Sequence, residues 1–100
     1  MSRPIQDDEQ ANANTSGQIV MFTTAWCGDC RRAKRIFDAL GVPYAEINID
    51  REPAAAETVM RLNHGNRSVP TIVFPDGSRL VEPSNAALEA KLTPFAQRAR

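Results

Sequence analysis

The residues best suited to chemistry are two cysteines, Cys27 and Cys30, the only cysteines in a chain of 100 residues. They read Cys-Gly-Asp-Cys, a spacing that sets the two thiols one turn apart if a helix begins there. Such a pair can form and break a disulfide, or it can supply two ligands of a metal site. It is not the framework of a disulfide-stapled secreted domain, because those carry more cysteines at wider spacings.

The remaining residues favour redox chemistry over a metal. His64 is the one other soft ligand, and the chain has no second cysteine pair. Structural zinc normally takes four ligands, so we expect no metal. His64 is interpreted as the end of a helix rather than as a base or ligand. Two cysteines paired by chance remain an alternative, but their place at a strand-to-helix junction argues against it.

The elements that must position the thiols follow from hydrophobic patterning. An apolar, β-branched run at residues 19–24 predicts a buried strand that ends just before the cysteines. Apolar residues then recur at helical spacing and predict a helix to Leu40, with Gly41 as its C-terminal cap. The core face of this helix is expected to consist of Cys30, Ala33, Ile36, Phe37 and Leu40.

The second half of the chain repeats strand and helix and then turns back. It predicts a strand at 44–49, a helix with Asp50 as N-cap, strands at 70–74 and 79–82 around a tight turn, and a final helix capped by Ser84. The final helix should bury Ala87, Leu88 and Leu92, and Pro94 should kink or end it.

The order β-α-β-α-β-β-α predicts an α/β fold, with a mixed four-stranded sheet and three flanking helices. Residues 18–100 are expected to form this single domain. Residues 1–17 are polar and acidic, and we expect a disordered tail.

Cys27 is predicted to be the nucleophile. At the start of a helix, unpaired N–H groups and the macrodipole favour a thiolate and lower the pKa of the thiol. Cys30, one turn on and more buried, could resolve a mixed disulfide on Cys27. Gly28 leaves room for a partner's backbone. Asp29 opposes the Cys27 thiolate by like charge, so we expect it to reduce, without cancelling, the lowering of the Cys27 pKa.

Two further features could form a docking groove beside the thiols. Val69-Pro70 opens the third strand, where it holds either a cis peptide or an ordinary trans proline at a strand edge. Opposite the thiols, Val69 would offer its backbone to an extended peptide or a thiol tripeptide. Trp26, the one tryptophan, adjoins Cys27 and is either an exposed wall of the groove or a core residue.

Charge and hydropathy exclude other classes of function. Twelve basic residues balance twelve acidic ones, which argues against a nucleic-acid binder or a polybasic membrane anchor. No apolar run is long enough to span a bilayer, and the N-terminus has no secretory signal. We therefore expect a cytoplasmic protein, and a monomer.

With these features in hand, the sequence resembles the glutaredoxin family of the thioredoxin-like fold over about residues 18–92, and within it the mycoredoxins of actinobacteria. The resemblance rests on Thr23-Thr24-Ala25-Trp26-Cys27-Gly28-Asp29-Cys30, on Asn66-Arg67-Ser68-Val69-Pro70-Thr71, and on Asp76-Gly77-Ser78 with Pro83-Ser84.

The resemblance implies a cis Pro70, Cys27 as nucleophile and Cys30 as resolving cysteine. It also implies reduction of protein mixed disulfides with mycothiol as co-substrate and no bound cofactor. Glutathione-using members carry Gly-Gly-x-Asp before the last helix and a lysine before the motif. This chain has Glu82-Pro83-Ser84-Asn85 and Thr23-Thr24 there, which favours another low-molecular-weight thiol. The position of Asp29 more often holds an uncharged residue.

Three alternatives stay open. The same dithiol could be recharged by thioredoxin reductase, as in glutaredoxin-like electron donors to ribonucleotide reductase. Two subunits could instead share an iron–sulfur cluster through Cys27 and thiol ligands. The chain could also be a non-catalytic interaction domain that keeps the fold.

Overall fold

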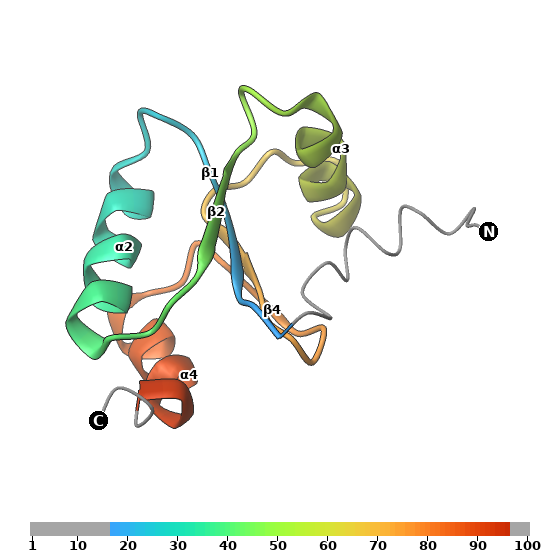
Figure 1. Ribbon diagram of the computed structural model, residues 1–100. Coiled ribbons are helices and arrows are strands. Elements are labelled where there is room, and N and C mark those ends of the chain that lie inside the picture. Colours follow the sequence, from blue (N-terminus) through green and yellow to red (C-terminus); the bar gives the residue numbers. More distant parts are fainter. Residues whose placement is uncertain (1–16, 97–100) are drawn as a thin grey trace.

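The structure, a computed structural model, describes residues 17–96 (Figure 1). The tail expected at residues 1–17 therefore lies, except for Gly17, outside the described residues. The seven elements appear in the predicted order: β1 (Val20–Thr23), α2 (Gly28–Leu40), β2 (Ala45–Asn48), α3 (Pro53–Leu62), β3 (Thr71–Val73), β4 (Arg79–Val81) and α4 (Asn85–Ala96).

The four strands form one mixed sheet in the order β2-β1-β3-β4. β1 runs parallel to β2, which requires the crossover through α2. β3 is antiparallel to both β1 and β4, and a tight turn suffices to join β3 to β4. The central strands β1 and β3 are buried along their whole length, so other elements cover both of their faces.

Helices cover both faces of the sheet: α2 and α4 lie on one side and α3 on the other (Figure 1). Because side chains alternate along a strand, Met21 and Ile72 pack with α2 and α4, while Phe22 and Val73 pack with α3. These are the α/β architecture and the three flanking helices that the sequence predicts.

The ends of the helices show which capping residues the sequence predicts correctly. Gly41 caps α2 with a left-handed backbone at φ 69°, as predicted. Ser84 caps α4, because its hydroxyl accepts a hydrogen bond from the Ala87 N–H at 3.1 Å. His64, at φ 57°, follows the end of α3 and is exposed, as the sequence indicates.

Two expectations about the second half of the chain are wrong, and a third is narrowed. Asp50 does not cap α3, since Glu52 is the N-cap and Pro53 begins the helix; Asp50 pairs with Arg67 at 3.0 Å instead. Ala87 is exposed, and Leu88 alone of that pair is buried. Of the two outcomes expected at Pro94, a kink or an end, the proline does not end α4, which continues to Ala96, and Phe95 and Ala96 pack against the core.

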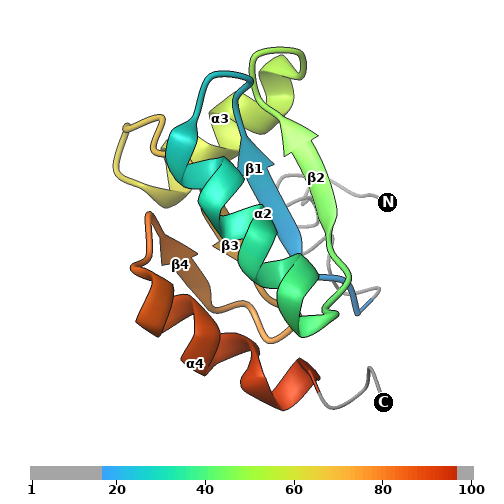
Figure 2. The same ribbon diagram turned by 90° about the vertical axis from the view of Figure 1, so that its left-hand side faces the viewer.

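The fold brings the start of α2 beside the loop that leads into β3 (Figure 2). No helix among residues 17–96 is both long and apolar enough to cross a membrane.

Candidate active site

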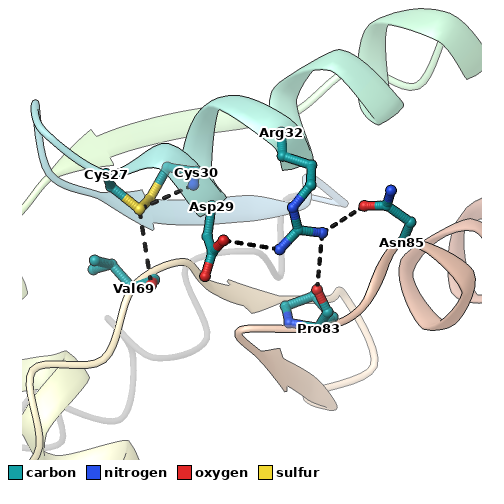
Figure 3. A network of polar contacts seen from close by, with 7 residues as sticks. All are labelled: Cys27, Asp29, Cys30, Arg32, Val69, Pro83 and Asn85. Carbon is teal, nitrogen blue, oxygen red and sulfur yellow. Dashed lines mark hydrogen bonds and ion pairs between the residues drawn. A yellow bond between two sulfur atoms is a disulfide. The ribbon is translucent and has the colours of Figure 1, made fainter.

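Cys27 and Cys30 form a disulfide at the N-terminus of α2. Cys27 is the N-cap residue, with an extended backbone, and the helix begins at Gly28. The Cys30 N–H donates a hydrogen bond of 2.9 Å to the Cys27 sulfur (Figure 3). This is the position that a serine or aspartate oxygen takes in an ordinary capped helix, so the geometry favours an anion at Cys27.

The two sulfurs differ in access to solvent. Cys30 is 1% exposed and belongs to the buried face of α2, whereas Cys27 is 9% exposed at the edge of the site. An incoming disulfide can therefore reach Cys27 more readily than Cys30. The adjacent Trp26 is 90% exposed, so it is a surface residue and not part of the core.

Val69 and Pro70 lie directly opposite the dithiol. The Val69–Pro70 peptide is cis, and the Val69 carbonyl oxygen lies 3.8 Å from the Cys27 sulfur (Figure 3). Of the two forms that the residues by themselves left open, the structure has the cis form, which the family resemblance implies. Pro70 itself is buried, and its carbonyl accepts a hydrogen bond of 2.9 Å from the Glu82 N–H.

A buried polar pair that the sequence did not reveal holds this loop. The Asn63 side-chain amide donates to the Thr71 hydroxyl at 3.1 Å, and that hydroxyl donates to the Ser68 carbonyl at 2.8 Å. Asn63 and Thr71 are 8% and 0% exposed. Since buried polar groups need partners, this chain of bonds fixes the loop that carries Val69.

Gly28 and Asp29 both lie on the outer side of the first helical turn. Apart from its two chain neighbours and the backbone of its own helix, no atom of residues 17–96 lies within 4 Å of where a β-carbon would stand at Gly28, so the space outside it is open. The Asp29 carboxylate pairs with Arg32 at 3.0 Å. Arg32 also donates to the Pro83 carbonyl at 3.5 Å and to the Asn85 side chain (Figure 3).

A second ion pair supports β1 below the cysteines. The Glu46 carboxylate accepts hydrogen bonds from the Thr23 hydroxyl at 2.8 Å and the Lys34 ammonium at 2.6 Å. Burial raises the pKa of this carboxyl, but the bonds from Lys34 and Thr23 outweigh burial and hold the pKa below its ordinary value. The sequence carries no signal for this contact, because Glu46 and Lys34 lie on different elements.

Among residues 17–96, no group of three or more His, Cys, Asp and Glu side chains is arranged to hold a metal ion. A hollow of about 490 Å³ lies at the edge of β2, lined by residues that include Asn48, Arg51 and Ala55. None of its lining residues is a predicted site residue. The chemistry of the described site therefore rests on the dithiol, the Val69 backbone and the charges around them.

Comparisons with known proteins agree on one family. Residues 19–79 match the glutaredoxin family. A Mycobacterium tuberculosis protein named as a glutaredoxin is 45% identical over 78 residues, which span 78% of this chain and 93% of that protein. Mycoredoxin 1 of Corynebacterium glutamicum is 35% identical over 78 residues, which span 78% of this chain and 96% of its own length.

Solved structures show the same fold. A wheat glutaredoxin superposes with a TM-score of 0.71 at 20% identity, covering 100% of this chain and 98% of its own. The glutaredoxin-like NrdH-redoxin of Escherichia coli gives a TM-score of 0.62 at 26% identity, covering 73% of this chain and 92% of its own.

Proposed function

Because the chain belongs to the glutaredoxin family and is a thiol–disulfide oxidoreductase of the thioredoxin-like fold, we propose that it reduces mixed disulfides between proteins and mycothiol, with Cys27 as nucleophile. The observation that carries the assignment of Cys27 is its sulfur's place at the N-cap of α2, where it accepts the Cys30 N–H at 2.9 Å. Cys30 is the resolving cysteine. The binding groove consists of Trp26, Gly28, Asp29 and Val69, with the buried Pro70 beneath it holding the Val69 backbone.

The reaction proceeds by two thiol–disulfide exchanges. The Cys27 thiolate attacks the mycothiol sulfur of the mixed disulfide, so a Cys27–mycothiol bond forms and the client cysteine leaves as a thiolate that takes up a proton. A second mycothiol, as thiolate, attacks the mycothiol sulfur on Cys27. This step releases the Cys27 thiolate and mycothiol disulfide, so each client thiol that is freed consumes one free mycothiol, and the other half of the mycothiol disulfide comes from the client mixed disulfide.

In a dithiol reaction, Cys27 first forms a mixed disulfide with the client. The Cys30 thiolate then attacks the Cys27 sulfur, which closes the Cys27–Cys30 bond and releases the reduced client. The burial of Cys30 suits this role, because a resolving thiol needs to reach only the sulfur one turn away.

The choice of mycothiol rests on the mycoredoxin relative and on charge. Glutathione brings two carboxylates, while mycothiol carries its cysteine on an uncharged sugar–inositol unit. At the site, the Asp29 carboxylate stands beside Cys27, and Arg32 and Arg67 are each engaged with an aspartate. Such a surface favours a thiol without carboxylates. The same proposal places the enzyme in the cytoplasm, because the dithiol must be reduced in each cycle, and takes it to act as a monomer.

The neighbouring proposal keeps the dithiol chemistry and changes the electron source to thioredoxin reductase, as the likeness to NrdH-redoxin favours. The deciding measurement is the rate at which the oxidised protein is reduced by mycothiol with its reductase, compared with thioredoxin reductase alone. Fast reduction by mycothiol supports our proposal, and Cys30→Ser should then still remove mycothiol from proteins. Reduction by thioredoxin reductase alone, with Cys30 essential, would refute it.

A further inference from the structure

We propose that Arg32 is a positioning residue for the nucleophile: it neutralises the Asp29 carboxylate beside Cys27 and so keeps the Cys27 thiolate accessible at neutral pH. The inference rests on the proposed role of Cys27. It concerns the charge at the site and is independent of which thiol reduces the enzyme.

The contacts of Arg32 are specific. Its guanidinium pairs with Asp29 at 3.0 Å and reaches the Pro83 carbonyl at 3.5 Å and the Asn85 side chain. These partners come from α2 and from the loop that begins α4, so one side chain links the two helices. Figure 3 shows the Asp29 carboxylate turned toward the guanidinium.

The position of Arg32 is unfavourable without these partners. It lies in the N-terminal part of α2 and contacts Asn85, the first residue of α4. Both helix N-termini carry partial positive charge and disfavour a cation. The guanidinium is held there by acceptors, and the one charged acceptor among them is Asp29.

The effect of Arg32 on the ionisation of Cys27 follows from the order of residues in Cys27-Gly28-Asp29-Cys30. Asp29 lies between the two cysteines, and a free carboxylate there would oppose a thiolate by like charge. Paired with Arg32, the carboxylate is part of a neutral unit, and the helix N-terminus can stabilise the thiolate. Both side chains are partly exposed, so the pair should add little to the stability of the fold. Its effect should appear in the ionisation of Cys27.

The test titrates Cys27 in a Cys30→Ser background, where Cys27 is the one remaining thiol. Thiolate absorbance in the ultraviolet is followed against pH. Arg32→Gln should leave Asp29 unneutralised and raise the pKa of Cys27, so that the thiolate-to-thiol ratio falls about two- to fivefold at a given pH, as is usual for one charge near a helix N-terminus. Arg32→Lys should restore most of the ratio.

Two further variants identify the route of the effect. The matched control is Arg35→Gln, which removes the same charge from an exposed arginine one turn along α2 and should change the ratio less. Asp29→Asn with Arg32→Gln should return the titration close to that of the starting protein.

An unchanged titration in Arg32→Gln, or a double variant that still behaves like Arg32→Gln, would overturn the proposal. Failure of the proposed function is a separate result, because it would appear as absent reduction by mycothiol in the protein with both arginines intact.

Discussion

The two cysteines should differ in reactivity, and the structure supplies the size of the difference. The comparison uses two single-thiol proteins: Cys30→Ser leaves Cys27 as the one thiol, and Cys27→Ser leaves Cys30. The Cys30→Ser change removes a sulfur but retains the backbone N–H at position 30. The hydrogen bond to the Cys27 sulfur, 2.9 Å long in the starting protein, should therefore persist in the variant.

Two interactions favour the Cys27 thiolate. A hydrogen bond to a charged acceptor contributes about 1.5–3 kcal/mol, and a helix N-terminus contributes about 0.3–1 kcal/mol. At pH 6 an ordinary cysteine is about 0.3% thiolate, and a shift of about 2–4 kcal/mol raises this fraction about 20- to 240-fold. A thiolate of lower pKa is also a weaker nucleophile, which lowers the reaction rate of each thiolate about 4- to 20-fold. Cys27 should react about 5- to 10-fold faster than an unperturbed thiol.

The assay is the rate of alkylation by iodoacetamide at pH 6, followed by mass spectrometry. Cys30 should react more slowly than an unperturbed thiol, because it is 1% exposed. Each variant is also measured in denaturant, where the two rates should become equal. Equal rates in the folded proteins, or a faster Cys30, would refute the assignment of Cys27 as nucleophile.

Three further predictions concern the surroundings of the dithiol. Gly28→Leu should fold normally, because the space outside Gly28 is open. It should slow the reduction of a protein mixed disulfide by at least about tenfold but leave the reduction of a small disulfide unchanged. Equal losses of rate with both substrates would contradict a role of Gly28 in docking the protein substrate. Thr71→Val should cost about 1–3 kcal/mol in urea unfolding by leaving the buried Asn63 amide without its acceptor, whereas the exposed Thr93→Val should change stability by under about 0.5 kcal/mol. The pKa of Glu46 lies below its ordinary 4.5, so its stabilising effect is present above pH 4.5 and is lost as pH falls through the folded value. Glu46→Gln should therefore make acid unfolding shallower, and an unchanged acid profile would exclude this pair as a contributor.

Local sequence signals were sufficient to predict the structure wherever a residue interacts with its own neighbours along the chain. Gly41 ends α2, and Ser84 caps α4, because both act within a single helical turn. The apolar runs predict the strands for the same reason, since alternation along a strand decides its burial. The prediction that Asp50 caps α3 was wrong because the Asp50 carboxylate pairs instead with Arg67, which is 17 residues away in the sequence.

The sequence by itself determined that two cysteines able to form a disulfide lie at the start of a helix. Two cysteines one helical turn apart, after a buried strand, are enough to specify an exchangeable dithiol at a helix N-terminus, because spacing and helix geometry are local properties. The tertiary structure alone decided what surrounds that dithiol. These contacts join residues from different elements: Val69 approaches Cys27, Asn63 donates to Thr71, and Arg32 donates to Pro83 and Asn85. Such contacts depend on how helices and strands pack, and no spacing along the chain encodes them.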